Sequence, residues 1–356
     1  MPPLFFNRPN FKRFSFNYKK GSVVVGGFGG TGCFLANLAC ECLTSFGKPP
    51  ECVMLGHPDK RIVQSRRSAV SLWYRNRVVS VYANGNLDGM GKSLVVGVRN
   101  KGKWSEEVEN SIKRMCKKIN KKHVSTYIHF SDTGGSGAIM GDELLGKIKA
   151  LGRFDYIFNC IPQATKDSKL TQANEEEILS NAVKTCTEKT RNFYMRNFTK
   201  KLEKDIANVA SICGIALGTL GGEIEDYEKS DWWRILYPLT EVNCEIDGSG
   251  LDGIVKRPNY HLTISASCRA ILKHELLKRD TLLLVGNVHP KMLKSIWKDV
   301  AGELPKGTSL PEVRQVAPIS IKDELYNTVA VRFRRMGYIP LDTPIFDKAH
   351  EIDKVK

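Results

Sequence analysis

Glycine-rich segments that follow apolar runs are the feature that most limits the folds open to this chain. The first glycine turn, GGFGGTG at 26–32, follows the apolar run 22–25. The second glycine turn, SDTGGSG at 131–137, follows the run 127–130. Between them lies a third glycine segment, DGMGKS at 88–93. Glycines between a strand and a helix let backbone N–H groups approach a phosphate at the helix N-terminus, so the pattern predicts a phosphate site at the strand ends.

The rest of the apolar pattern alternates strands with helices. We expect strands at 22–25, 52–55, 78–82, 127–130, 156–161 and 193–196, and helices at 30–44, 105–122, 139–151, 174–188 and 199–220. This alternation predicts a parallel, doubly wound α/β sheet. After Trp233, strands at 259–268 and 328–334 and helices at 269–279 and 290–301 indicate a smaller α/β unit.

Charge and cysteine usage restrict the partners and the compartment. The chain has 54 Lys and Arg against 38 Asp and Glu, a net charge of +16, which admits nucleic acid, an acidic partner surface or simply a basic exterior. Its ten cysteines include no CxxC pair, so we expect buried thiols in a reducing cytosol and no metal-ligating residues. No apolar run reaches the roughly 18 residues of a membrane span, and residues 1–20 lack the apolar core of a secretory signal.

A dinucleotide-binding Rossmann site is the alternative that the first glycine turn leaves open. Such a site places an acidic residue at the end of the second strand, to bind the ribose. Here that strand ends at Leu55, and Asp59 follows only after Gly56, His57 and Pro58. The Walker A pattern GxxxxGK[ST] is absent from the sequence.

The second glycine turn carries a specific resemblance. The segment SDTGGSGAIMG at 131–141 resembles the GGGTGSG signature of the tubulin/FtsZ superfamily, and is closest to the form in the phage-encoded tubulins of the PhuZ and TubZ type. The GGTG of 29–32, and the order of three glycine turns, long helix and acidic loop, are also similar to that family over about 22–235. Asp132 departs from the pattern, since relatives have an uncharged residue there.

The resemblance implies a tubulin/FtsZ fold: a Rossmann-like GTPase domain with a parallel sheet, a long central helix and a smaller C-terminal α/β domain. The implied division is a basic N-terminal arm at 1–21, a nucleotide-binding domain at 22–198, the central helix and acidic loop at 199–234, the C-terminal α/β domain at 235–340 and a short tail at 341–356.

The nucleotide implied by the resemblance is GTP or GDP with Mg²⁺. The residues expected to hold it are Gly27, Gly29, Gly30, Thr31, Gly32, Gly89, Gly91, Lys92, Thr133, Gly134, Gly135, Ser136 and Gly137. Asn197 and Asp205, with Glu203 as a second candidate, are expected near the guanine, and Asp167 near the ribose. A carboxylate accepts from the N1–H and N2–H₂ of guanine, which adenine lacks. Asn174 lies too far from the acidic loop to serve as a base contact.

Catalysis is expected between subunits. In this family an acidic loop after the central helix enters the nucleotide pocket of the next subunit, and Glu225 and Glu228 fall on its two acidic positions. A carboxylate there orients and polarises the attacking water. The resemblance thus implies a GTPase that assembles head to tail with copies of itself and positions phage nucleoid or plasmid partition cargo in the host bacterial cytoplasm. The alternative is a non-polymerising GTP-binding relative that uses its basic surface for DNA or partner filaments.

Overall fold

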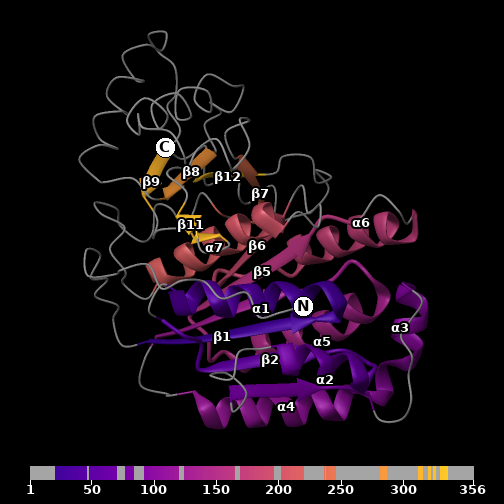
Figure 1. Ribbon diagram of the computed structural model, residues 1–356. Helices are drawn as coiled ribbons and strands as arrows, with labels where there is room; N and C mark the ends of the chain where they lie inside the picture. The colour runs from indigo at the N-terminus through magenta and orange to yellow at the C-terminus, as the bar shows by residue number, and fades with distance from the viewer. Residues whose placement is uncertain are drawn as a thin grey trace, which may run out of the picture.

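The computed structural model describes most of the first 219 residues and short parts of the remainder (Figure 1). The described residues are 21–45, 48–69, 77–83, 92–119, 124–164, 169–195, 202–219, 236, 238–245, 281–286, 312–315, 320–321, 324–325 and 329–335. Within them no helix is long and apolar enough to span a membrane.

Parallel strands form the main sheet. In chain order the first seven are β1 (Gly21–Phe28), β2 (Cys52–Gly56), β3 (Val78–Val81), β4 (Val124–Phe130), β5 (Tyr156–Pro162), β6 (Thr190–Met195) and β7 (Leu239–Glu245). They pair in the spatial order β3-β2-β1-β4-β5-β6-β7, and every neighbouring pair is parallel. β4 therefore lies beside β1 although two strands separate them in the sequence, so the carboxyl ends of β1 and β4 are neighbours.

Helices cover both faces of this sheet. They are α1 (Gly29–Ser45), α2 (Lys60–Ala69), α3 (Leu94–Asn100), the short 3₁₀ helix η3 (Lys101–Lys103), α4 (Ser105–Lys118), α5 (Gly135–Leu151), α6 (Lys169–Lys184) and α7 (Leu202–Thr219). Along β1, Val23 and Val25 join a core with α1, α2 and α7, while Val24 joins a second core with α4 and α5. Side chains of a strand alternate between faces, and a strand buried on both faces reads as one apolar run.

A further set of strands extends the sheet beyond β7. β12 (Val329–Arg335) pairs antiparallel with both β7 and β8 (Thr281–Gly286), and β9 (Glu312–Gln315) pairs parallel with β8. Together the described strands give a ten-stranded sheet, while β10 (Ser320–Ile321) and β11 (Glu324–Leu325) form a separate hairpin. The strand expected at 328–334 is confirmed as β12, whereas the other elements expected at 259–279 and 290–301 lie outside the described residues.

The sequence-based expectations hold for the first six strands of the main sheet and fail in specific places. The parallel α/β sheet and the long helix before the second unit are confirmed, the latter as α7. Two short helices, α2 and α3, and the strands β7 to β11 were not expected. The helix expected at 174–188 begins earlier, at Lys169, and ends at Lys184. The boundaries proposed for the domains stay a prediction.

The buried thiols agree with the cysteine analysis. Six of the described cysteines are buried and two are half-buried, and none of these eight is paired in a disulfide. Burial raises the pKa of Cys33 and Cys52 to about 12, so both remain protonated thiols near neutral pH. These side chains act as small apolar groups, and the described residues include no cluster of three or more His, Cys, Asp or Glu suited to a metal ion.

Candidate functional site

The two glycine turns lie side by side at one edge of the sheet. β1 leads into the first turn and β4 into the second, and the parallel register places Gly27 opposite Phe130. Helix α1 begins at Gly29 and helix α5 at Gly135, so both helix N-termini follow these adjacent strand ends. In open α/β sheets this edge is where ligands bind.

Close backbone approach explains why glycine stands at the centre of both turns. Gly29 has φ of +80°, and a Cβ there would lie 2.8 Å from the Gly137 Cα. A Cβ on Gly137 would lie 2.6 Å from the carbonyl oxygen of Phe28. A Cβ on Gly32 would lie 2.5 Å from the carbonyl oxygen of Phe130. Side chains at these positions would separate the two turns, so the glycines bring the two backbones into contact.

Asp132 links the two turns through its carboxylate. Its Oδ2 accepts a hydrogen bond from the Thr31 N–H at 3.2 Å, and its Oδ1 accepts one from the Gly134 N–H at 3.2 Å. The carboxylate thus occupies backbone donors of both glycine turns. Neither α1 nor α5 carries an acidic residue in its own first turn, so Asp132 is the anionic group that the structure places at these helix N-termini.

The end of the third glycine segment packs against the second turn. Ser93 caps α3 by accepting a hydrogen bond from the Val96 N–H at 3.3 Å. A Cβ on Gly135 would lie 2.4 Å from the carbonyl oxygen of Ser93. The space beside Gly135 is thus filled by the Ser93 backbone and not left for a phosphate, while a contact of the Gly135 backbone with the nucleotide stays a prediction.

Asn174 joins the third segment to the second turn from the side of α6. Its buried amide donates to the carbonyl oxygens of Lys92 at 2.8 Å and of Thr133 at 3.0 Å. The next residue, Glu175, accepts hydrogen bonds from the Ala164 N–H and the Tyr194 hydroxyl, which fixes α6 against the sheet. Sequence reasoning considered Asn174 only as a base contact, and missed that it holds two phosphate-site segments together.

Open space remains at the N-terminus of α1. A Cβ on Gly30 would meet no heavy atom of the described residues within 4 Å, and the nearest atoms to one on Gly134 would be those of the Asp132 carboxyl, at 3.8 Å. Lys92 is exposed and has φ of 63°, a strained backbone for a non-glycine residue. The described residues thus leave room for an anion beside the N-terminus of α1, whereas the Asp132 carboxylate does not suit one.

The remaining predicted residues divide into those that the structure places and those that it does not describe. Thr133 is buried beside Asn174, Gly27 packs against the backbone of Gly32, and Asp205 is fully buried in the first turn of α7. Gly89, Gly91, Asp167, Asn197, Glu225 and Glu228 lie outside the described residues, and of Ser136 and Glu203 only the helical backbone is described.

Asp59 does not favour a dinucleotide site. Its carboxylate accepts hydrogen bonds from the Arg61 N–H at 2.8 Å and from the Arg61 guanidinium at 3.0 and 3.1 Å. The Arg61 side chain holds the pKa of Asp59 below its usual value. The carboxylate that would bind a ribose hydroxyl is thus already hydrogen-bonded to Arg61 in the first turn of α2.

A small cavity lies beneath the second turn, between α5 and α6. Its volume is about 100 Å³, and its lining includes His129, Ser131 and Asn159. The His129 Nδ1 lies 3.1 Å from the Tyr127 hydroxyl, whereas the His129 Nε2 and the Ser131 Oγ make no hydrogen bond in the structure. Burial lowers the pKa of His129 to about 3, so this imidazole is neutral.

Comparisons with known proteins identify the architecture. No protein-family model matches, and no curated protein sequence is detectably similar. Among solved structures, CetZ2 from Haloferax volcanii, a GTPγS-bound protofilament, aligns over 94% of this chain and 99% of its own, with 14% identity and a TM-score of 0.55. CetZ1 from the same organism, a GDP-bound monomer, aligns over 94% and 100%, with 13% identity and a TM-score of 0.53.

The chain has the tubulin/FtsZ fold. Within that fold, the first and second glycine turns are the loops after β1 and β4, and α7 is the helix that follows β6. At 13–14% identity the likeness establishes architecture and leaves the ligand to be argued from the residues. A special closeness to the phage tubulins remains an expectation from sequence.

Proposed function

We propose that this chain binds GTP in the space bounded by the two glycine turns and the end of the third glycine segment. The observation that carries the proposal is the pair of helix N-termini, α1 and α5, held together at adjacent strand ends and lacking acidic residues in their first turns. Backbone N–H groups and helix dipoles at such ends favour phosphate. The two structural neighbours were solved as GTPγS-bound and GDP-bound forms, which supports a guanine nucleotide.

Mg²⁺ is the cofactor that fits the departure at Asp132. The Asp132 carboxylate is an oxygen ligand of the kind Mg²⁺ prefers, and Mg²⁺ is commonly held by one or two carboxylates together with substrate phosphates. When bound, the ion would offset phosphate charge beside a carboxylate that otherwise repels it. Without such a cation, Asp132 competes with phosphate for the N–H groups of Thr31 and Gly134.

Assembly and hydrolysis form the second part of the proposal. Copies of the chain stack head to tail, so that Glu225 and Glu228 of one subunit enter the pocket of the next and orient the attacking water. The protofilament form of one structural neighbour supports self-association. The likeness of the second glycine turn to the phage form supports a cargo role, the positioning of phage or plasmid DNA in a bacterial cytoplasm.

A GTP-binding protein that does not polymerise is the second candidate, favoured by the net charge of +16, which suits binding to DNA or to another filament. Sedimentation of the purified protein with GTP, with a non-hydrolysable analogue and without nucleotide distinguishes the two. Pelleting that requires the nucleotide supports the filament, whereas GTP binding without pelleting supports the second candidate.

Gly30→Glu tests the phosphate site directly. A side chain fits at this position, and a glutamate in the first turn of α1 suits the helix dipole, so the fold should be retained. Its charge should weaken GTP binding by about a hundredfold, as expected when a carboxylate faces phosphate in a partly desolvated site. Gly146→Glu, in α5 and also with open space around its Cβ, is the matched control. Equal GTP affinity of both variants in isothermal titration calorimetry would refute this site.

A further inference from the structure

A basic groove crosses the sheet at β3, away from the carboxyl ends of β1 and β4. It has a volume of about 510 Å³, and its floor is β3, the terminal strand of the sheet among the described residues. Its charged lining consists of Lys60, Arg67, Arg114, Lys117, Lys118 and Glu107. Five cations therefore face one carboxylate, and all five are exposed to solvent.

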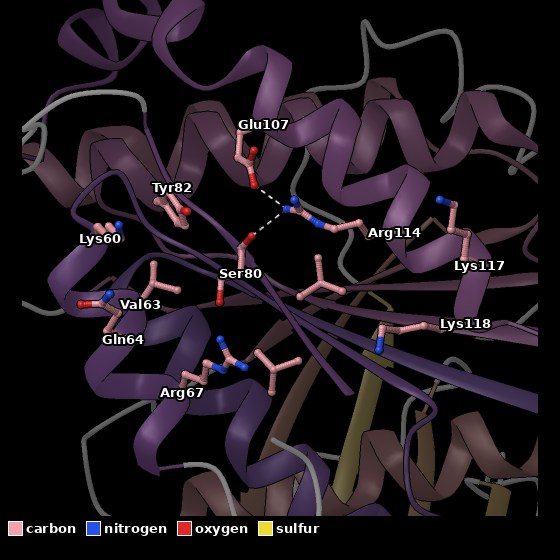
Figure 2. A pocket seen from close by; sticks show the side chains of 12 residues that line it. Lys60, Val63, Gln64, Arg67, Ser80, Tyr82, Glu107, Arg114, Lys117 and Lys118 are labelled. Atoms are coloured by element: carbon pink, nitrogen blue, oxygen red, sulfur yellow. Dashed lines mark hydrogen bonds and ion pairs between the residues drawn. The ribbon is translucent and has the colours of Figure 1, made fainter. Parts of the chain in front are cut away.

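The cations flank β3 from both faces of the sheet (Figure 2). Lys60 and Arg67 belong to α2, which packs with the core on one face, and Arg114 and Lys117 belong to α4, which packs with the core on the other. The groove thus straddles the edge strand, with a positive wall above it and another below it.

The carbonyl oxygen of Ser80 in β3 lies within the groove and accepts a hydrogen bond there. Arg114 donates from its guanidinium to the carbonyl oxygen of Ser80 at 3.2 Å, and the same group forms an ion pair with Glu107 (Figure 2). Across the strand, the Lys60 ammonium lies 5.3 Å from the centre of the Tyr82 ring. Arginine at an open edge protects it against uncontrolled pairing, and its bond to Ser80 can be exchanged for one to a carboxylate.

We propose that this groove binds an extended acidic peptide segment of a partner protein, which adds a strand to β3. Side chains of a strand point alternately to opposite faces of the sheet. Acidic residues at adjacent positions of the added strand would therefore meet α2 cations and α4 cations in turn, while its backbone pairs with the edge of β3. The groove would therefore recognise a partner segment that is extended and carries acidic side chains on both of its faces.

The shape of the groove favours a peptide over nucleic acid. A volume of about 510 Å³ falls in the range of pockets that enclose small ligands or short segments. A DNA duplex would lie across the rim of such a groove and would make no contact with β3 at its floor. Base-stacking sites for single strands require open aromatic rings, whereas Tyr82, the aromatic residue in the described lining, faces the Lys60 ammonium.

The test uses the full chain and a fluorescein-labelled peptide, Val-Glu-Asp-Glu-Asp-Val, in an anisotropy titration at low salt. Binding should weaken as salt is raised, because the contacts are exposed ion pairs. The same peptide N-methylated at its acidic residues keeps the charge but loses backbone donors, and should bind at least about tenfold more weakly. Failure of the unmodified peptide to bind, or equal binding of both peptides, would overturn strand addition.

Charge reversal locates the site. Arg67→Glu on α2 and Lys117→Glu on α4 should each weaken peptide binding by about tenfold, because each replaces an attraction by a repulsion. Lys113→Glu, exposed on α4 and outside the groove lining, is the matched control and should bind the peptide like the unmodified chain. Equal loss in all three variants would mean that general charge, not the groove, attracts the peptide, which contradicts the proposal.

A short oligothymidylate of the same net charge distinguishes the other class of ligand. We expect the oligonucleotide to bind more weakly than the peptide. We also expect Lys117→Glu and Lys113→Glu to change its affinity equally. Tighter binding of the oligonucleotide, lost in both groove variants, would replace the peptide proposal by a nucleic-acid site. Because this groove contains none of the nucleotide-site residues, its failure leaves the proposed GTP binding untouched, and the reverse also holds.

Discussion

Asp132 is the residue whose chemistry differs most from what a phosphate site requires. Its carboxylate accepts hydrogen bonds from the Thr31 and Gly134 N–H groups, which are donors that a phosphate would also use. The carboxylate therefore holds the two turns together and would compete with the phosphate of the proposed GTP. At the scale of single residues, the proposed site places a carboxylate on the same backbone donors that a phosphate would need.

We predict that Asp132→Asn tightens GTP binding by about tenfold in the absence of Mg²⁺, because the substitution removes one negative charge and retains an acceptor oxygen. Asp132→Ala should tighten binding less, since the link between the turns is also lost. Calorimetric titration with and without Mg²⁺ measures both effects. If Asp132 mainly holds the metal ion, the Asn variant will instead bind GTP more weakly, and only when Mg²⁺ is present.

His129 gives the protein a pH-dependent stability. Burial lowers its pKa to about 3, whereas an unfolded histidine titrates near 6.5. As the pH falls below about 6.5, the unfolded chain binds a proton at this residue and the folded chain does not, so the free energy of unfolding decreases by up to about 1.4 kcal/mol per pH unit.

The predicted variant is His129→Gln, which should make the free energy of unfolding less sensitive to pH between about 7 and about 5, because it removes this proton linkage. Urea unfolding monitored by circular dichroism at both pH values supplies the comparison. The absolute stability also changes, since His129 stacks on Phe28 with ring centroids 5.3 Å apart, so the test is the slope with pH. An unchanged slope would mean that other groups set the acid sensitivity.

Helix α6 joins two segments of the proposed phosphate site although it lies outside both. Asn174, buried on its sheet-facing side, donates to the Lys92 and Thr133 carbonyl oxygens and so joins the third glycine segment to the second turn. Those two segments belong to different loops, and Ser93 also packs against Gly135. The position of α6 therefore determines how Lys92 lies beside the second turn.

Asn174→Ala should lower the free energy of unfolding by about 1–3 kcal/mol, because the buried carbonyl oxygen of Thr133 and the partly buried one of Lys92 lose their donor. It should also weaken GTP binding several-fold, since the third segment is no longer held in place. Asn181→Ala is the matched control on the same helix, where the amide donates to the more exposed Asp142 carboxylate at 3.0 Å. Nucleotide affinity that falls equally in both variants would indicate a general effect of α6 packing.

At the scale of the whole molecule, the proposed activity depends on two copies of the chain. The proposed pocket is bounded by the glycine turns at 26–32 and 131–137 and by Lys92 and Ser93, whereas the predicted acidic loop with Glu225 and Glu228 follows α7 in the sequence. If the active site exists only at a contact between subunits, GTP turnover per subunit must rise with protein concentration. A variant that damages only the loop and one that damages only the pocket must then be able to complement each other.

Glu228→Gln should retain GTP binding and slow phosphate release by roughly a hundredfold or more, in line with the loss of a positioned general base. Mixing it with Gly30→Glu should restore part of the turnover, because an intact pocket then meets an intact loop. A phosphate-release assay over a range of protein concentrations measures both effects. Turnover that is independent of concentration, or normal in Glu228→Gln, contradicts the shared site and favours the non-polymerising candidate.

Local patterns in the sequence determined the fold class and most of the main elements. Apolar runs at 22–25 and 127–130 predicted β1 and β4 because a strand buried on both faces must be apolar throughout. The glycines after them predicted a phosphate site at the strand ends, which stays a prediction. The contacts at Gly29 and Gly137 show that glycine also lets the two turns meet, which the sequence pattern did not predict. Short amphipathic pieces such as α2 and α3 were missed because their periodicity covers too few residues.

The tertiary structure alone decided which of these pieces meet. The Thr31–Asp132 hydrogen bond joins residues 101 positions apart, and Asn174 reaches Lys92 across 82 positions. No local periodicity encodes such contacts, since they follow from the placement of β4 directly beside β1 and of α6 against α5. The basic groove also depends on the strand order. Side chains of α2 and α4 come together around β3 because β3 is the terminal strand among those described. The local sequence specified the strands and turns, whereas the order of the strands in the sheet decided which of their side chains lie in contact.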